Sequence, residues 1–194
     1  MIAWTITAAL AAKSLDRGVV STEDEEIAQI ARNLGADVPF LRPGELADDE
    51  TTTLAVLRNV VHELEVREGY FCDAVMTLQP TSPMRKTAHI DEAVALFSAD
   101  PQADSLVSCI AVPHIYHPRS VMKRDDQGYL VPYLNDSQPT RRQDKEPVFA
   151  RNGAAIYITR RICVDNFVFG GRLLAYMIDV RFSIYIHTEV GFER

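Results

Sequence analysis

Residues 73–83 read Asp-Ala-Val-Met-Thr-Leu-Gln-Pro-Thr-Ser-Pro, and this stretch decides the fold class. Residues 73–78 form a short, mostly apolar run that predicts a buried strand. Residues 79–83 are a polar loop whose two prolines end that strand. Apolar residues at helical spacing follow the loop, at Ile90, Ala93, Val94 and Phe97. A buried strand that runs through a polar loop into an amphipathic helix is typical of an α/β protein.

The same alternation of strands and helices extends along the chain in both directions. Apolar stripes at helical spacing begin near residue 2 and recur over residues 27–34 and 54–64. Short strands are expected at residues 17–21, 38–41, 105–112, 154–159 and 173–179. Strands that alternate with helices predict a mainly parallel sheet covered on both faces. The 194 residues suit one domain over 1–194, interrupted by an irregular insert at about residues 113–147.

The composition limits the classes of partner. The formal net charge of −7 does not favour nucleic acid or an anionic membrane as a partner. The three cysteines, Cys72, Cys109 and Cys163, lie in apolar or strand-like contexts without metal-site spacing, which predicts reduced thiols. No stretch approaches the ~18–20 consecutive apolar residues that a membrane span needs. We therefore expect a soluble, cytoplasmic protein with no nucleic-acid or membrane partner.

Polar residues gather where the expected strands end. The ends carry Ser21-Thr22, Arg42-Pro43 and the loop at residues 79–83. In open α/β sheets, ligands bind beyond the carboxyl ends of the strands. Residues 141–161 add six Lys or Arg against two Asp or Glu, which suits a small anionic ligand. The residues alone thus predict a polar small-molecule site and do not name its ligand.

Four ordered blocks of sequence point to a family. They lie at residues 19–28 with 38–43, 78–85, 141–144 and 151–158. In this order they resemble the acylneuraminate cytidylyltransferases, the CMP-N-acetylneuraminic acid synthetase family. The resemblance implies a Rossmann-like three-layer sheet of the nucleotide-diphospho-sugar transferase type. It also implies transfer of CMP from CTP to a nonulosonic (sialic-type) acid, usually with Mg²⁺, giving a CMP-sugar and pyrophosphate.

The resemblance also assigns site residues. On the nucleotide side it implies Arg42, Thr81, Ser82 and Arg85. For the sugar acid it implies Gln79, Arg142, Asn152 and Tyr157. An arginine suits the carboxylate of such an acid, because its planar fork donates two parallel hydrogen bonds. From the residues alone, the loop could equally be a turn that its prolines hold rigid, with Arg85 on the surface. Tyr157 could equally be an aromatic residue of a buried strand that only packs in the core.

Two departures from the family pattern affect activity. Tyr185 and His187 stand where the family has the aspartates that bind metal, so we expect no metal ligands and no intact catalytic residue. The family begins with a strand and a phosphate-cradling loop before the helix that here starts near residue 2. We therefore expect an N-terminally truncated or degenerate member with unpaired strand edges at the middle of the sheet. The 194-residue chain is expected to be weak or inactive.

Three interpretations of the function remain open. The first is CMP transfer to a sialic-type acid. The second is a catalytically inactive remnant that binds sugar acid or assembles with a complete homologue. The third is a sister enzyme for pseudaminic or legionaminic acid. The resemblance further implies a homodimer that pairs through the insert at about residues 113–147.

Overall fold

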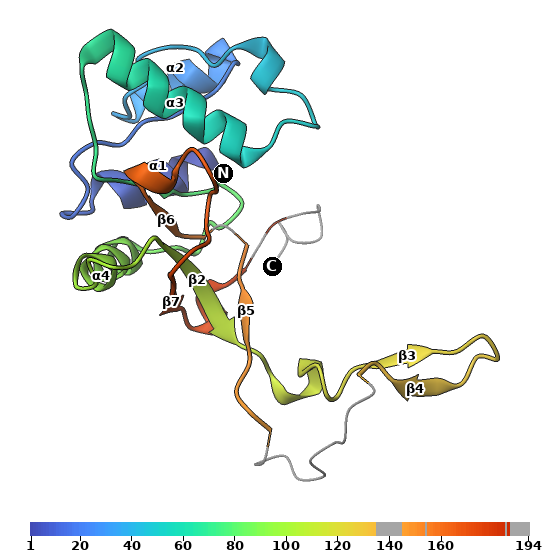
Figure 1. The fold of residues 1–194 in the computed structure, drawn as a ribbon. Helices are drawn as coiled ribbons and strands as arrows, with labels where there is room; N and C mark the ends of the chain where they lie inside the picture. The colour runs from blue at the N-terminus through green and yellow to red at the C-terminus, as the bar shows by residue number, and fades with distance from the viewer. Residues whose placement is uncertain (135–144, 154, 185, 187–194) are drawn as a thin grey trace.

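The structure, a computed structural model, describes residues 1–134, 145–153, 155–184 and 186 (Figure 1). Its α-helices are α1 (Ile2–Leu10), α2 (Glu25–Asn33), α3 (Thr53–Glu68) and α4 (Thr87–Ser98). Its strands are β1 (Ala74–Thr77), β2 (Ser105–Ala111), β3 (Met122–Arg124), β4 (Leu130–Pro132), β5 (Phe149–Arg151), β6 (Tyr157–Arg160) and β7 (Leu173–Met177). Short 3₁₀ helices occupy Gly44–Leu46, His114–Tyr116, Arg161–Cys163 and Val180–Phe182. The α/β class is confirmed.

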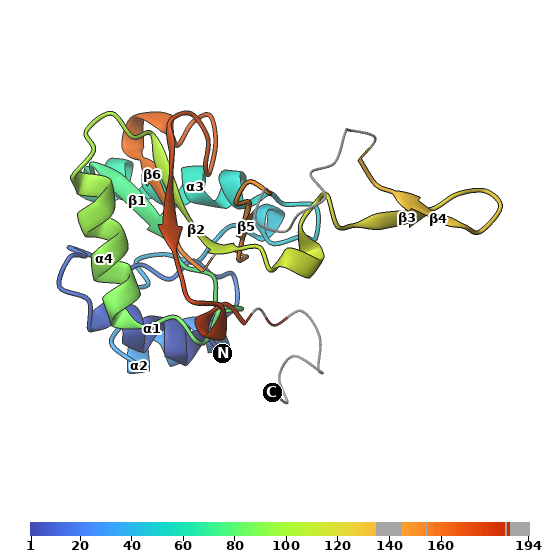
Figure 2. The same ribbon diagram turned by 90° about the horizontal axis from the view of Figure 1, so that it is seen from below.

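The main sheet has five strands. Four of them follow the order β1-β6-β2-β5, and β7 pairs with β2 (Figure 2). Ser105 of β2 lies opposite Thr159 of β6 and also opposite Leu173 of β7, so β6 and β7 flank β2. Helix α4 packs on the sheet through Ile90, Ala93 and Phe97. The unit from β1 through α4 to β2 is therefore the one that the stretch at residues 73–97 predicts.

The prediction of a mainly parallel sheet is wrong for the pairs that the structure describes. Strands β1 and β2 run in the same direction, but β6 lies between them and is antiparallel to both. Strand β5 is also antiparallel to β2, and only β7 is parallel to it. Among the described residues, no α-helix separates β5 and β6 from the insert, and a parallel neighbour usually requires a helical crossover.

The strands expected at residues 17–21 and 38–41 are reduced to one parallel bridge between Val19 and Asp37. The Val20 amide donates to the Asp37 carbonyl (2.9 Å) and the Asp37 amide to the Gly18 carbonyl (3.3 Å). Nothing among the described residues pairs with the other edge of this segment. The segment therefore has extended backbone but no place in the main sheet.

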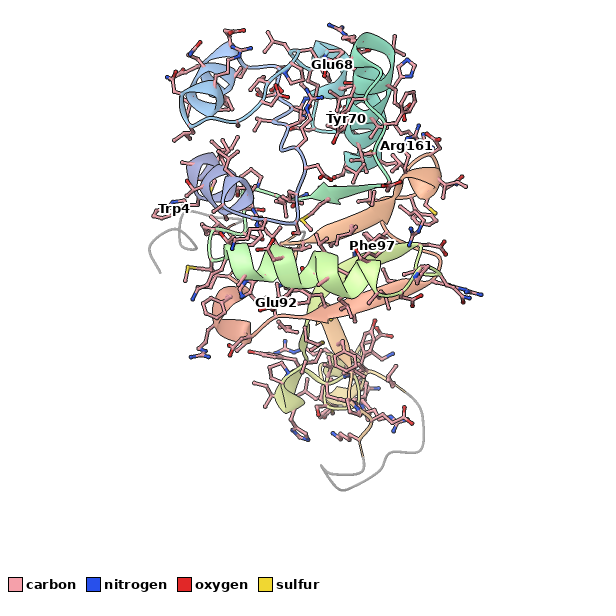
Figure 3. The ribbon with its side chains drawn as sticks, turned by 90° about the vertical axis from the view of Figure 1, so that its left-hand side faces the viewer. Trp4, Glu68, Tyr70, Glu92, Phe97 and Arg161 are labelled. Carbon is pink, nitrogen blue, oxygen red and sulfur yellow. The ribbon has the colours of Figure 1, made fainter. Side chains whose placement is uncertain are left out.

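The apolar core is divided into separate clusters. The largest lies between α4 and the sheet, around Ile90, Leu106 and Ile156. A second joins α1 to α2 through Ile6 and Ala28, and a third lies under α3. Helix α3 ends at Gly69, whose left-handed backbone (φ 62°) terminates the helix. Helices α2 and α3 thus form a layer of their own above β1 (Figure 3).

One bidentate ion pair ties this layer to the sheet. Arg161, directly after β6, donates to both carboxylate oxygens of Glu65 on α3, at 2.6 and 3.0 Å. The side-chain hydrogen bond from Arg161 is the main reason that the pKa of Glu65 lies below its ordinary value of 4.5. A carboxyl group whose pKa is lower in the folded than in the unfolded state stabilises the fold at pH values above its unfolded-state pKa. This stabilisation is lost as the pH falls through the folded-state pKa.

The variant Glu65→Gln is therefore expected to be less stable at neutral pH and less sensitive to acid. Urea unfolding midpoints, followed from about pH 7 to about pH 3, should fall more steeply in the wild type, and the two curves should converge at the acid end. Glu63→Gln is the control, because Glu63 pairs with Arg67 within α3 and does not reach the sheet. Parallel curves for the wild type and Glu65→Gln would show that the pair contributes nothing.

Candidate functional site

The loop between β1 and α4 forms the centre of the candidate site. It is a tight turn in which the Ser82 amide donates to the Gln79 carbonyl (3.4 Å) and the Arg85 amide donates to the Ser82 carbonyl (3.3 Å). The Thr81 carbonyl accepts from the Ile186 amide (3.0 Å), so a segment beyond β7 lies beside the loop. The two prolines restrict the backbone and hold the polar side chains in one arrangement.

Arg85 is buried beneath this loop. Its guanidinium donates to the Ala155 carbonyl (2.5 Å), the Gln79 carbonyl (3.3 Å) and the Thr5 hydroxyl on α1 (2.7 Å). Burial lowers the pKa of Arg85 to about 10 because the charged form is desolvated. Arg85 therefore joins the loop to α1 and to the start of β6, and most of its donors are engaged within the protein.

A second network begins at the next residue after Ala155. The Ile156 amide donates to the Ser108 hydroxyl (3.0 Å), and Ser108 donates to Oδ1 of Asn152 (2.7 Å). Asn152 is buried, and its Nδ2 has no partner. Through Ala155 and Ile156, this network connects Asn152 to the loop that carries Arg85. Ser108 is not among the residues predicted for the site, although a serine within the apolar run of β2 is a visible signal of a buried polar role.

Arg42 and Gln79 meet at a pocket of ≈260 Å³ at the end of α3 where Thr53 begins the helix. Asp48 and Thr51 also line it. Arg42 forms an ion pair with Glu23, and the hydrogen bond from Arg42 lowers the pKa of Glu23. The pocket is therefore polar and holds one carboxylate, that of Asp48, beside the amide of Gln79.

Several buried polar atoms have no hydrogen-bond partner within the described part of the chain. Among the described residues they are Ser21 Oγ, Arg42 Nε, Asn59 Oδ1, Thr77 Oγ1, Thr81 Oγ1, Ser82 Oγ, Arg85 Nε and Asn152 Nδ2. Five of them belong to residues that the sequence assigned to the site: Arg42, Thr81, Ser82, Arg85 and Asn152. A buried polar group without a partner costs free energy, and such groups are uncommon in folded proteins. A polar ligand bound at the five assigned residues would supply partners for these atoms.

The remaining predicted site residues lie elsewhere. Tyr157 is buried on β6, and its ring packs against Phe169 at 5.1 Å between centroids, as a core aromatic does. Arg142, Tyr185 and His187 lie outside the described residues. The structure thus brings together Arg42 with Gln79, and the loop residues with Asn152, while the ring of Tyr157 packs against Phe169.

The described residues do not fit a magnesium ion. Mg²⁺ prefers several oxygen ligands in near-octahedral geometry, mostly carboxylates, phosphates and water. Within residues 1–134, 145–153 and 155–184, no three His, Cys, Asp or Glu side chains are placed to share a metal. The carboxylate of Asp48 lines the pocket with Arg42 and Gln79 and accepts from the Thr51 hydroxyl (2.6 Å), whereas the carboxylate of Glu23 is paired with Arg42. We derive no chemical step through a metal from these residues.

Comparison with known proteins gives a consistent set of similarities. Residues 1–169 match the family described as "Cytidylyltransferase". The chain is 30% identical over 195 residues to an N-acylneuraminate cytidylyltransferase of Streptococcus agalactiae. That alignment covers 99% of this chain and 45% of the streptococcal protein. It is 32% identical over 172 residues to the CMP-N,N'-diacetyllegionaminic acid synthase of Legionella pneumophila. That alignment covers 86% of this chain and 69% of the synthase. The chain thus spans about half the length of the streptococcal relative.

The fold comparison agrees. A solved structure of a CMP:2-keto-3-deoxy-manno-octonic acid synthetase complexed with CTP superposes with a TM-score of 0.63. It covers 90% of this chain and 77% of the other, at 16% sequence identity, so the likeness concerns the fold. In addition, none of the helices in the described part is long and apolar enough to cross a membrane.

Proposed function

The chain belongs to the cytidylyltransferase family, and from this premise we propose that it transfers CMP from CTP to a nonulosonic acid of the sialic type. The observation that carries the proposal is the group of unpartnered buried polar atoms at Arg42, Thr81, Ser82 and Asn152. Hydroxyl and amide groups of this kind suit the phosphates of a nucleotide and the hydroxyls and carboxylate of a sugar acid.

In this reaction a hydroxyl oxygen of the sugar acid forms a bond to the α-phosphorus of CTP. The bond from that phosphorus to the bridging oxygen breaks, pyrophosphate leaves with the electron pair, and the hydroxyl proton passes to solvent or a base. Chemistry of this kind depends on positioning and on neutralising phosphate charge. We assign Thr81 and Ser82 to the nucleotide and Gln79 and Asn152 to the sugar acid.

The electrostatics of the nucleotide side favour a second candidate, a remnant that binds sugar acid without efficient catalysis. Arg42 is already paired with Glu23, and Arg85 is buried with protein acceptors. Both arginines that the family resemblance places on the nucleotide side are therefore engaged within the protein. Asn152, on the sugar side, keeps its donor unpartnered.

Pyrophosphate release distinguishes the two candidates. With CTP, Mg²⁺ and a sialic, legionaminic, pseudaminic or 2-keto-3-deoxy-octonic acid, we expect release that requires both substrates and runs below the roughly 1 s⁻¹ at the slow end of typical enzymes. The acid that gives the fastest release identifies the preferred sugar. Release from CTP without any acid would contradict CMP transfer. The absence of release with all four acids would favour the binding remnant.

We also propose that the insert pairs two copies of the chain. It carries the hairpin β3–β4, which extends away from the sheet (Figure 1). Its apolar side chains are exposed, with Ile115, Tyr116, Tyr129 and Leu130 each about two-thirds accessible. An exposed apolar patch of this kind marks an interaction surface in many proteins.

The three cysteines are unpaired, which supports a reducing, cytoplasmic location.

Sedimentation tests the pairing. We expect the wild type to be a dimer at tens of micromolar and Leu130→Asp to be monomeric, because a carboxylate buried in an apolar contact has no partner. Val66→Asp is the matched control, since Val66 is equally exposed but lies on α3, outside the insert. A monomeric wild type would refute the pairing, and a dimer that survives Leu130→Asp would place the interface elsewhere.

A further inference from the structure

A group of side chains holds the segment after β7 against the start of α4. This segment contains the 3₁₀ helix Val180–Phe182. The ring of Phe182 packs edge-on against the ring of His89 on α4, with 5.2 Å between centroids, and Phe182 also packs on the main apolar core. The same segment continues to Ile186, whose amide bonds to the Thr81 carbonyl in the loop of the candidate site (3.0 Å). The contact between His89 and Phe182 therefore bears on how Ile186 is placed beside that loop.

His89 is in the form that lacks a proton on Nδ1. The Lys86 amide donates to His89 Nδ1 (3.2 Å), and the His89 amide donates to the Lys86 carbonyl (3.1 Å). A ring nitrogen that accepts a hydrogen bond carries no proton, so this geometry assigns the ring proton to Nε2. Protonation of Nδ1 breaks the bond from Lys86 and adds a positive charge at the N-terminal end of α4, where the helix dipole disfavours it.

Cations gather around the same two rings. Lys86 Nζ lies 4.3 Å from the centre of the Phe182 ring, and the guanidinium carbon of Arg181 lies 5.9 Å from it. A protonated His89 adds a third positive charge to this group, and like charges at such distances repel one another. Among the described residues, the titratable groups around His89 are Arg85 on the loop, Lys86 and Glu92 on α4, Tyr176 on β7, and Asp179 and Arg181 beyond β7.

The carboxylates of this cluster already accept hydrogen bonds. Glu92, labelled in Figure 3, accepts from the hydroxyl of Tyr176 on β7 (2.5 Å). Asp179 accepts from Arg181 with both oxygens, at 2.8 and 3.0 Å. Burial is the main reason that the pKa of His89 lies below its ordinary value of 6.5, while Glu92 opposes this shift and two neighbouring cations add to it. The neutral ring is therefore the form that the cluster stabilises.

We propose that His89 is a pH-dependent positioning residue for the candidate site. Its neutral form holds Phe182 and thereby keeps Ile186 against the loop at residues 79–83, and its protonation releases this segment. The neutral ring stabilises the contact fully at pH values above 6.5, and this stabilisation is lost as the pH falls through the folded-state pKa of His89. The consequence for function rests on the loop being the site, whereas the movement itself does not depend on the proposed transfer of CMP.

An NMR titration of the whole chain from about pH 8 to about pH 4.5 tests the proposal. The ring signals of His89 give its pKa, and the amide signals of Phe182 and Ile186 report the position of the segment. We expect both amide signals to shift with the midpoint of the His89 ring. Protection of the Ile186 amide against hydrogen exchange, corrected for the intrinsic effect of pH, should fall at least about threefold across that midpoint. Amide signals without a step at this midpoint would refute the release.

His89→Asn removes the titration and keeps the hydrogen-bond acceptor. The asparagine Oδ1 accepts from the Lys86 amide as Nδ1 does, but it takes up no proton in this pH range. The step at Ile186 should therefore be absent from this variant. His62→Asn is the matched control, because His62 is exposed on α3 and its loss should leave the step unchanged. A step in His89→Asn equal to that of the wild type would overturn the proposal.

Glu92→Gln gives a second test that keeps His89 in place. The glutamine still accepts from the Tyr176 hydroxyl, but the variant lacks the negative charge that opposes the lowering of the His89 pKa. The midpoint of the His89 ring should move to lower pH, and the midpoint of the Ile186 amide should move with it by the same amount. A purely structural contact produces no such linked shift. Midpoints of His89 and Ile186 that move separately would also overturn the proposal.

Discussion

Arg85→Ala is expected to lower the free energy of unfolding by about 3 kcal/mol, the largest loss of stability among the changes considered for the site. The substitution removes three hydrogen bonds and leaves the Ala155 carbonyl and the Thr5 hydroxyl buried without a donor. Each unsatisfied buried group of this kind costs about 1–3 kcal/mol. The variant also removes the desolvation penalty of a buried guanidinium. This gain offsets part of the cost, which is why the expected loss is not larger.

Equilibrium urea unfolding of the wild type and Arg85→Ala measures this loss directly. Arg124→Ala is the control, because Arg124 is an exposed residue of β3 in the insert and should change stability by no more than about 0.5 kcal/mol. A loss below about 1 kcal/mol for Arg85→Ala would show that Arg85 is not a structural link. Arg85 would then be available to the nucleotide, as the family resemblance implies.

Local patterns predicted the elements around the site well. The apolar run before the loop at residues 79–83 became β1, and the helical stripe after it became α4. The runs expected at residues 105–112 and 173–179 became β2 and β7 with small changes of boundary. These elements depend mainly on the periodicity of nearby residues, which the sequence displays directly.

The direction of strand pairing could not be predicted in the same way. An apolar run such as that of β6 looks the same whether its neighbours are parallel or antiparallel, because both faces are buried in either case. The burial of Arg85 was also hidden, since its partners Thr5 and Ala155 lie 80 and 70 residues away. A contact at that separation leaves no local pattern around the arginine.

Asn152→Asp is expected to remove most of the affinity for a sialic-type acid. Ser108 holds Oδ1 of Asn152, which leaves Nδ2 as an unpartnered donor. The aspartate has nearly the same shape and still accepts the hydrogen bond from the Ser108 hydroxyl. It replaces the Nδ2 donor with a carboxylate oxygen, however, and its negative charge repels the carboxylate of the sugar acid. We expect at least a tenfold loss of affinity, equivalent to about 1.4 kcal/mol. Asn152→Ala, which adds no charge, should lose less, and thermal unfolding verifies that both variants fold.

Saturation-transfer NMR with N-acetylneuraminic acid and with CTP tests whether Gln79 and Asn152 belong to a sugar-acid site. For the wild type we expect a signal from the acid, with a dissociation constant near or above ~1 mM, and a weaker signal from CTP. The acid signal should disappear in Asn152→Asp and persist in Asn33→Asp, which adds the same charge at an exposed position of α2. An equal acid signal in Asn152→Asp, no acid signal in the wild type, or tighter binding of CTP than of the acid would contradict the account.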